Sequence, residues 1–252
     1  MFRVVIPARH DSVRLPGKAL RELRGKPMLQ WVYARACAAG ATEVLIATDD
    51  MRILDAACAF GAEAVMTAAS HTSGTDRIAE VAAARRWPES GVVVNLQGDE
   101  PLMPPALIAQ VAALLDSTPG ADIATLATPI GSVGELLDLN AVKVVTGASG
   151  RALYFSRAPI PWNRSGAPAE LASQTDASGA RRHVGIYAYR VAALKRLAAL
   201  APGALELREK LEQLRALENG LHIQVADARE PPGPDVNTPA DLARVEALLA
   251  AQ

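Results

Sequence analysis

The chain has 252 residues, half of them hydrophobic, with 26 Lys and Arg residues against 27 Asp and Glu residues. This length can bury the core of one large α/β domain, and the composition excludes an intrinsically disordered chain. The formal net charge of −1 gives no overall basic character, so we expect no nucleic acid as a partner. No run of ~18 apolar residues predicts membrane insertion, and no leader precedes the first strand, so we expect a cytoplasmic protein.

The first half of the chain alternates short β-branched segments with amphipathic segments, which predicts a parallel α/β sheet. A long polar loop at 9–26 separates the first strand from the first helix. Cys37 and Cys58 fall in predicted helices at a spacing unsuited to a metal, so we expect both to be buried in a reducing compartment. The expected strands are 2–8, 44–47, 64–66 and one beginning at 92, and the expected helices are 27–40, 53–60, one ending near 86 and one ending near 115.

After residue 121 the strand-like segments follow one another with short or irregular connections. We therefore expect an inserted, partly antiparallel sheet at about 121–190 within a single domain. Residues 164–180, rich in Gly, Ser, Ala and Pro, predict a loop that is mobile or orders on binding. The expected strands are 123–130, 142–146, 152–156, 184–189 and 223–226, and the expected helices are 191–200, 205–219 and 239–250, the last capped by Thr238.

The strongest functional signal is the apolar segment Val92–Leu96, which predicts a strand buried on both faces and is followed by Asp99. Ligands of open α/β sheets bind outside the carboxyl ends of the strands. Asp99 is therefore a candidate ligand for a metal held over a bound substrate. The alternative is that Asp99 or Glu100 caps the helix that follows.

A second signal is the loop after the first strand. It carries the cations Arg9, His10, Arg14 and Lys18, with Gly17 just before the lysine. A loop with a glycine, free backbone N–H groups and several cations suits a polyphosphate. The loop has neither the glycine spacing of a Walker loop nor that of a dinucleotide fingerprint. The alternative is a solvated basic loop without a ligand.

Several blocks of the sequence form a recognisable set that runs from the first strand to the last helix. The blocks are Ile6–Arg9, Arg14–Lys18, Gly25–Met28, His71–Arg77, Asn95–Pro101, Asn140–Val145, Tyr154–Ala158, Ile160–Trp162, Arg182–Tyr187, Leu211–Arg215 and Asn237–Pro239. Together they resemble 3-deoxy-manno-octulosonate cytidylyltransferase, the CMP-Kdo synthetase family of lipopolysaccharide assembly, and the resemblance covers nearly the whole chain.

This resemblance implies a mostly parallel, Rossmann-like nucleotidyltransferase sheet with an inserted region that forms a homodimer. The implied reaction transfers CMP from CTP to the anomeric hydroxyl of free 3-deoxy-manno-octulosonate (Kdo), with Mg²⁺ as cofactor. Nucleotidyl transfer depends on in-line alignment and charge neutralisation, which suits cations on the phosphates and a metal on a carboxylate. The implied catalytic residues are Arg9, Lys18 and Asp99, and the implied nucleotide-binding residues are Ala8, Arg9, Lys18, Ser73, Thr75, Arg77 and Gln97.

Three of the implied nucleotide-binding residues also have a purely structural interpretation. Ser73 and Thr75 could cap the following helix, and Arg77 could be a surface arginine. Asp49 and Asp50 follow a strand, and we expect them only to cap the next helix.

The resemblance places the sugar on planar cations and hydrogen-bonding groups, which suit the carboxylate and hydroxyls of Kdo. The implied sugar-binding residues are Arg157, Arg164, His183, Glu212 and Gln213. The alternatives are that the two arginines are surface charges, that the histidine is a turn residue, and that the last two residues lie on the solvated side of a helix.

The sequence departs from the family pattern before the last helix. The family has an aspartate as second magnesium ligand where this chain has Asn237, and Asp235 stands two residues earlier. An amide oxygen is an acceptable hard donor, so we expect Asp99 and Asn237 as the metal ligands and Asp235 outside the ligand shell. The alternatives are that Asp235 replaces the ligand or that Asn237 only shapes the turn.

Other functions remain open at this point. A cytidylyltransferase for another sugar acid, such as amino-Kdo or a sialic-acid-like sugar, fits the same motifs. A non-catalytic nucleotide-binding regulator would retain the fold, although Arg9, Lys18 and Asp99 are all present. A GT-A glycosyltransferase would normally have an Asp-x-Asp motif, which this strand end lacks. No residue stands out as a general base.

Overall fold

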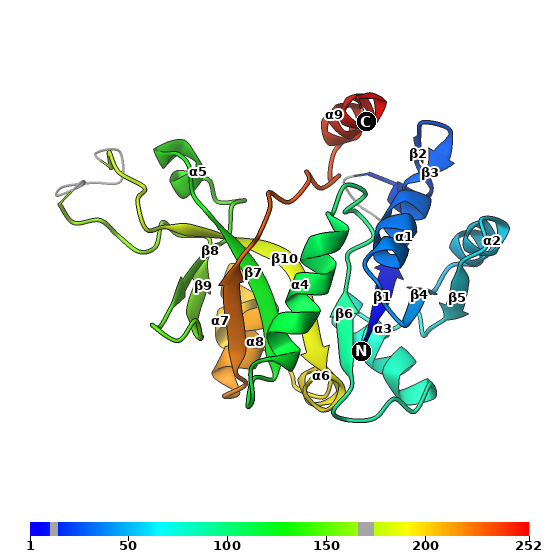
Figure 1. The fold of residues 1–252 in the computed structure, drawn as a ribbon, viewed down its shortest axis with the longest axis horizontal. Helices are drawn as coiled ribbons and strands as arrows, with labels where there is room; N and C mark the ends of the chain where they lie inside the picture. The colour runs from blue at the N-terminus through cyan, green and yellow to red at the C-terminus, as the bar shows by residue number, and fades with distance from the viewer. Residues whose placement is uncertain (11–14, 166–173, 252) are drawn as a thin grey trace.

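The computed structural model describes residues 1–10, 15–165 and 174–251 (Figure 1). Its central sheet has the strand order β11-β7-β10-β6-β1-β4-β5. Strand β10 runs antiparallel to β6 and β7, while the other neighbouring pairs along this order are parallel. The strands are β1 (Phe2–Ala8), β4 (Glu43–Thr48), β5 (Glu63–Met66), β6 (Val92–Asn95), β7 (Ile123–Pro129), β10 (Arg181–Arg190) and β11 (Ile223–Asp227).

Helices cover both faces of this sheet. One face packs against α1 (Met28–Ala38), α2 (Met51–Ala59) and α4 (Pro105–Asp116). The other packs against α3 (Gly74–Ala84), α6 (Val191–Ala198) and α8 (Gln213–Glu218). Because water is excluded from both sides, all four residues of β6 are buried, as its continuous apolar run predicts.

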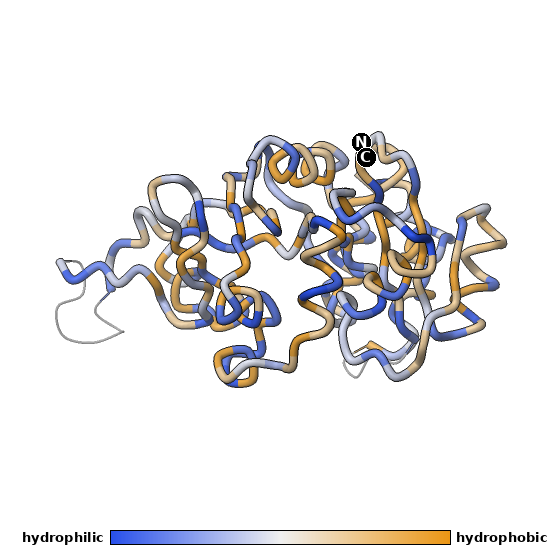
Figure 2. The backbone as a smooth tube through the Cα atoms, turned by 90° about the horizontal axis from the view of Figure 1, so that it is seen from below, coloured by the Kyte–Doolittle hydropathy of each residue, from blue (hydrophilic) through white to orange (hydrophobic). Residues whose placement is uncertain are grey.

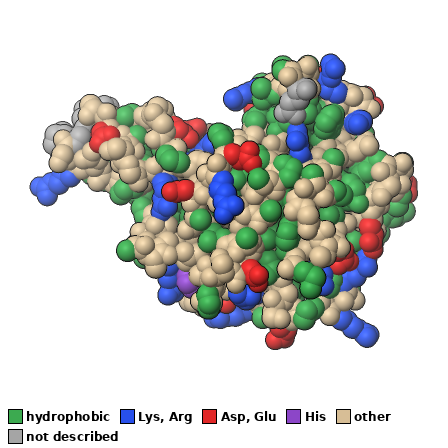
Figure 3. All heavy atoms as spheres, viewed as in Figure 1, with side chains coloured by type: hydrophobic (Ala, Val, Ile, Leu, Met, Phe, Trp, Pro, Cys, Tyr) green, Lys and Arg blue, Asp and Glu red, His purple; other side chains and the backbone are tan. Residues whose placement is uncertain are grey.

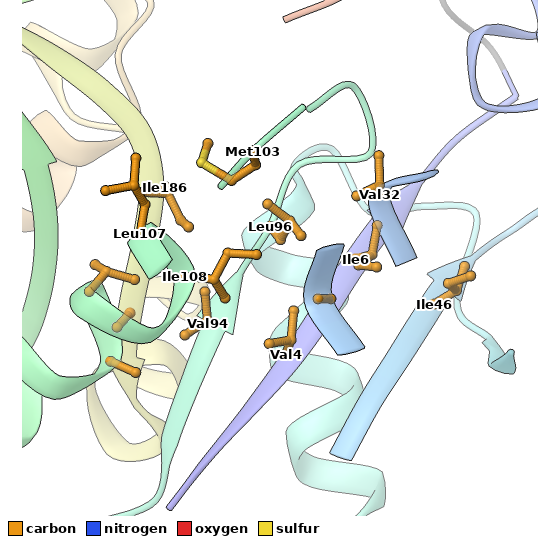
Figure 4. Close-up of a cluster of buried hydrophobic side chains, with 14 of the residues drawn as sticks. Val4, Ile6, Val32, Ile46, Val94, Leu96, Met103, Leu107, Ile108 and Ile186 are labelled. Atoms are coloured by element: carbon orange, nitrogen blue, oxygen red, sulfur yellow. The ribbon is translucent and has the colours of Figure 1, made fainter. Parts of the chain in front are cut away.

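The core on the α1–α4 face joins strands and helices that are distant in the sequence. Val94 and Leu96 from the centre of the chain pack with Ile6 of the first strand and Val32 of α1 (Figure 4). Figure 2 shows hydrophobic segments through the strands and helices, and hydrophilic residues toward the end of the arm, the segments 157–165 and 174–180 that extend to the left in Figure 1. The expected α/β fold with a mostly parallel sheet and some antiparallel strands is therefore confirmed.

The segment 121–190, expected to form an inserted sheet, contributes β7 and β10 to the main sheet. The hairpin of β8 (Lys143–Thr146) and β9 (Ala152–Ser156) extends from it, since β8 pairs with β10 at one end. Helix α5 (Val133–Leu137) lies on the same side, at the left of Figure 1. The role of this region in dimerisation stays a prediction.

Three local expectations were wrong. The polar loop at 9–26 contains a short helix, η1 (Lys18–Leu20), and a hairpin of β2 (Glu22–Leu23) and β3 (Lys26–Pro27). The helix expected at 205–219 is two helices, α7 (Ala204–Glu209) and α8, because Lys210 adopts a left-handed conformation with φ 57°. Cys37 and Cys58 are exposed, since both lie on the solvent side of their helices.

The last helix, α9 (Pro239–Ala250), begins where the sequence predicts. The side chain of Thr238 accepts the Asp241 amide, and the Asp241 side chain bonds back to Thr238, which completes a capping box. Within the described part of the chain, every helix is too short or too polar to cross a membrane.

Candidate active site

The two functional signals of the sequence meet at one edge of the sheet. Strands β1 and β6 are parallel neighbours, with Val5 opposite Asn95, so their carboxyl ends lie side by side. Gly98 makes this approach possible, because a Cβ atom there would lie 3.1 Å from the carbonyl oxygen of Pro7. The residues after Ala8 and the residue Asp99 therefore face the same space.

The loop after β1 returns to this edge through Gly17. This glycine has φ 66°, in the left-handed region that other residues rarely adopt. Its amide donates to the carbonyl of His10, and the Lys18 amide donates to the carbonyl of Leu15. The turn starts η1 and directs Lys18 toward Asp99.

Lys18 lies between the two predicted metal ligands. Its ammonium is 2.6 Å from Oδ2 of Asp99 and 3.2 Å from Oδ1 of Asn237. Two oxygens, 138 positions apart in the sequence by difference of residue numbers, thus converge on one cation. The Nδ2 of Asn237 donates to Asp235, so its amide is oriented with the oxygen toward Lys18.

The segment before α9 is held against Asp99 by its backbone. The amide of Val236 donates to the carbonyl of Asp99 at 2.9 Å. Gly233 allows the segment to cross Leu102, because a Cβ there would lie 2.5 Å from the Leu102 Cβ and carbonyl oxygen. These contacts bring Asn237 to the strand end.

Acidic groups surround this point. Burial, together with the charges of Asp99 and Asp235, raises the pKa of Glu100 to about 8. Burial and the Asp99 charge also raise the pKa of Asp235. Within residues 1–10, 15–165 and 174–251, no three His, Cys, Asp or Glu side chains form a metal-binding group. The predicted ligand pair consists of one carboxylate, Asp99, and one amide, Asn237.

A small cavity opens at the ends of β1 and β6. Its walls include Ala8, Arg9, Lys18, Gln97 and Asp99, which are five of the residues that the sequence predicts for nucleotide binding and catalysis. The guanidinium of Arg9 donates to the carbonyl of His71 at 2.7 Å, and Gln97 donates to Asn95 at 3.1 Å. Arg14, the other arginine of the predicted cation group, lies outside the described residues.

The start of α3 explains two further predictions in structural terms. Ser73 is the N-cap of α3 and forms a capping box with Asp76. The Thr75 hydroxyl donates to the carboxylate of Glu212, which joins a predicted nucleotide-binding residue to a predicted sugar-binding residue. Burial raises the pKa of Glu212, so this carboxyl group retains its proton at higher pH than a free one.

Arg77 is fully buried, so its interpretation as a surface arginine is wrong. Its guanidinium donates to Asp49 at 2.7 Å and to the hydroxyl of Thr67. Asp50 caps α2 as expected, accepting the Arg52 amide at 2.9 Å, but Asp49 is the partner of Arg77 and does not cap. Contact of Arg77 with a nucleotide stays a prediction.

A larger cavity, of about 660 Å³, adjoins Asn237. This volume suits a small-molecule ligand. Arg157 and His183, both predicted to bind the sugar, line it together with Asn237, Asp235 and Glu100. Figure 3 shows the surface hollowed along its upper edge, between the arm and the part that carries α9. Two of the five predicted sugar residues, Arg157 and His183, therefore line one cavity with Asn237, one of the two predicted metal ligands.

His183 is held in this wall as a neutral ring. Its Nε2 lies 2.9 Å from the Thr125 hydroxyl, and its ring packs edge-on against Phe155 with centroids 5.1 Å apart. Burial lowers the pKa of His183 to about 3. The ring can thus exchange hydrogen bonds with a ligand without carrying a charge at neutral pH.

The other predicted sugar residues are distributed unevenly. Glu212 and Gln213 lie at the start of α8, beside α3. Arg164 is exposed on the arm and is not among the residues that line either cavity. The structure thus brings Arg157 and His183 together and leaves Arg164 apart.

Some residues of the site were assigned no role from the sequence. Arg182, which begins a family block, and Asp138, which lies outside the blocks, line the larger cavity. Glu209 accepts the backbone amide of Arg157 at 3.0 Å. Glu209 was one of several carboxylates in a predicted helix. Only the break after α7 turns it toward β9, and no periodicity predicted that break.

The fold and site define the class of protein. A mostly parallel sheet flanked by helices, with a cationic loop and a carboxylate at adjacent strand ends, is the arrangement of a nucleotidyltransferase. The cytidylyltransferase family model matches residues 3–223, and the chain belongs to this family, among the 3-deoxy-manno-octulosonate cytidylyltransferases.

Relatives cover the whole chain. The 3-deoxy-manno-octulosonate cytidylyltransferase of Thioalkalivibrio sulfidiphilus is 55% identical over 250 residues, which are 99% of each chain. That of Halorhodospira halophila is 53% identical over 248 residues, covering 98% of this chain and 96% of the relative. A solved structure of CMP:2-keto-3-deoxy-manno-octonic acid synthetase complexed with CTP has a TM-score of 0.89 at 42% identity, covering 100% of this chain and 99% of its own.

Proposed function

We propose that this chain transfers CMP from CTP to the anomeric hydroxyl of free Kdo, releasing pyrophosphate. The hydroxyl oxygen forms a bond to the α-phosphorus of CTP, and the bond from that phosphorus to the pyrophosphate oxygen breaks. The product CMP-Kdo would serve lipopolysaccharide biosynthesis in the cytoplasm. The observation that carries the proposal is the contact between the walls of the two cavities, which we call the junction. Lys18 and Asp99 line the smaller cavity, and the Lys18 ammonium lies 3.2 Å from Asn237, which lines the larger cavity with Arg157 and His183.

The chain's own residues divide into a phosphate side and a sugar side. Arg9 and Lys18 carry positive charge at the ends of β1 and β6, where they would neutralise the phosphates of CTP. Arg157 offers a planar cation to the sugar carboxylate, and neutral His183 offers a hydrogen bond to a hydroxyl. Binding both substrates across this junction would align the hydroxyl with the phosphorus.

The donor set at the junction fits Mg²⁺. The oxygens of Asp99 and Asn237 already converge on a cation, the Lys18 ammonium, and carboxylate and amide oxygens are the ligands that hard divalent ions prefer. These two residues would hold the ion, with Asp235 orienting the Asn237 amide. A bound magnesium ion would supply positive charge to the phosphate oxygens. Lys18 would then turn toward the phosphates.

We further propose a homodimer formed through the region of β8, β9 and the arm. Leu139, Leu153 and Trp162 are exposed there, and exposed apolar side chains are typical of interfaces when they group together. Light scattering tests this proposal, since the mass of a single chain would contradict it.

The acceptor is the part of the function that most needs a direct test. We propose to incubate the protein with CTP, Mg²⁺ and a panel of Kdo, amino-Kdo and a sialic acid, and to measure pyrophosphate release. The highest kcat/KM is expected with Kdo. A preference for another sugar acid would assign the chain to that substrate, and CTP binding without turnover on any acceptor would indicate a nucleotide-binding regulator.

A further inference from the structure

Helix α7 is attached to the molecule mainly by polar contacts. None of its six residues is buried, so hydrophobic packing contributes little to its position. Its Glu206 forms a two-point ion pair with Arg215 of α8, at 2.7 and 2.6 Å. Its last residue, Glu209, contacts β9. The position of α7 therefore depends on these charged groups.

Glu209 forms three hydrogen bonds with Ser156 and Arg157 at the end of β9. Its carboxylate accepts the Ser156 hydroxyl at 2.7 Å and the Arg157 amide at 3.0 Å. Its backbone carbonyl accepts Nε of Arg157 at 2.8 Å. The left-handed Lys210 that follows turns the chain away, which leaves the Glu209 carbonyl free of helical bonding.

These contacts use Nε and Nη1 of the Arg157 guanidinium and leave its Nη2 without a hydrogen bond to the described part of the chain. Nη1 of Arg157 donates to the carbonyl of Leu139 at 2.9 Å, and the loop before it is tied down because Lys143 donates to the Asp138 carbonyl at 2.8 Å. Among the hydrogen bonds of the described residues, none uses Nη2 of Arg157. Arg157 lines the large cavity, whereas Glu209 does not.

The carboxylate of Glu209 does not bond directly to the Arg157 guanidinium, so the guanidinium charge can pair with a ligand. It bonds to the backbone amide of Arg157 and to Ser156, and no ion pair within 4.0 Å joins it to the guanidinium in the described part of the chain. Burial alone would raise the pKa of Glu209, but the hydrogen bonds from Ser156 and Arg157 outweigh it and lower that pKa. Glu209 is therefore ionised at neutral pH and remains a strong acceptor.

We propose that Glu209 is a positioning residue for the sugar-acid substrate, because it fixes Arg157, which lines the large cavity and keeps Nη2 of its guanidinium for a ligand. This inference rests on the proposed function, since it assigns Arg157 to the carboxylate of the sugar. Fixing a long side chain before binding lowers the entropy cost of binding. Loss of Glu209 should therefore weaken sugar binding without affecting CTP.

The test compares steady-state kinetics of the wild type with those of Glu209→Ala and Glu209→Gln. We expect Glu209→Ala to raise KM for Kdo about tenfold while KM for CTP and kcat at saturating Kdo change less than about twofold. Glu209→Gln should recover most of the loss, because the amide oxygen still accepts one of the two hydrogen bonds that the carboxylate accepts.

Glu218→Ala is the matched control. Glu218 accepts the Leu205 amide at 3.2 Å, so its removal loosens the start of α7 without touching Arg157. We expect KM for Kdo to stay within about twofold of wild type in this variant. An equal rise in both alanine variants, with parallel losses in Tm, would reduce Glu209 to a general structural role and overturn the proposal.

A double variant separates this inference from the proposed function. In an Arg157→Ala background, Glu209→Ala should add little to KM for Kdo, because both changes act through one guanidinium. If the two substitutions raised KM for Kdo by independent factors that multiply in the double variant, the proposal would be overturned, although Kdo would remain the substrate. Absence of wild-type turnover with Kdo would overturn the proposed function itself.

Discussion

Lys18 and Asp99, 81 positions apart in the sequence, form an ion pair of 2.6 Å, and the same ammonium lies 3.2 Å from the Asn237 side-chain oxygen. Lys18 comes from the loop after β1, Asp99 from the end of β6, and Asn237 from the segment before α9. One cation thus joins the three segments that the proposed chemistry requires. Both side chains of the ion pair are partly exposed, 17% for Lys18 and 25% for Asp99, so a substrate can reach them.

The first prediction concerns the charge of Asp99. Asp99→Asn should lower kcat by at least about 100-fold, because a neutral amide holds a divalent cation less strongly and no longer pairs with Lys18 as an ion. The fold should persist, since the pair is partly exposed, and circular dichroism should be unchanged. Near-normal turnover at ordinary magnesium would refute the assignment of Asp99 as a ligand.

The second prediction separates Asn237 from Asp235. Asn237→Ala should raise the magnesium concentration for half-maximal activity about tenfold or more, since it removes one of two converging oxygens. Asn237→Asp should retain activity at equal or lower magnesium. Asp235→Ala should have a mild effect, because Asp235 acts on the amide of Asn237. A magnesium titration in which Asp235→Ala is inactive and Asn237→Ala is near normal would place the ligand on Asp235.

The third prediction separates the phosphate side from the sugar side. Lys18→Ala and Arg9→Ala should reduce kcat with CTP much more than Arg157→Ala, because negative charge shifts onto the leaving pyrophosphate in the transition state. Arg157→Ala should mainly raise KM for Kdo, in line with its place in the large cavity. The division would fail if all three variants lost affinity for CTP alone in a binding titration.

The fourth prediction concerns the buried arginine of α3. Arg77→Ala should lower the free energy of unfolding by about 3 kcal/mol, because it leaves Asp49 without its cation and opens a cavity. Arg85→Ala, which removes an exposed ion pair with Glu63, should cost less than about 1 kcal/mol. Urea unfolding of the two variants measures the difference. Equal stability losses would contradict a structural role for the buried Arg77 pair.

The fifth prediction concerns acid stability. The folded-state pKa of His183 is lowered to about 3, below the usual value near 6.5, so the unfolded chain binds a proton that the folded chain excludes. Stability should therefore be full above pH ~6.5 and fall as the pH drops toward 3, by up to about 2 kcal/mol at pH 5. In His183→Gln the change in unfolding free energy between pH 7 and pH 5 should be smaller. An identical pH dependence in both proteins would show that His183 is not excluded from protonation.

Local patterns in the sequence were sufficient for several elements. The apolar run at Val92–Asn95 predicts a strand buried on both faces, because strands between two helix layers have no solvent side. The segment after Thr238 predicts the start of α9, because a capping box forms between residues three positions apart. Asp99 and the Lys18 loop could be placed at one sheet edge, since carboxyl ends of parallel strands meet there.

By itself the sequence therefore determined the class of fold, the adjacent strand ends and, through its family blocks, the candidate residues. Only the tertiary structure decided which of them touch. It buries Arg77 against Asp49, joins Thr75 to Glu212, and breaks the helix at Lys210 so that Glu209 reaches Arg157. It also leaves Arg164 exposed and both cysteines at the surface. The physical reason is that helix and strand periodicity reflects neighbours a few residues away, whereas these contacts join positions 28 to 137 residues apart, whose distances depend on how the whole sheet and its helices pack.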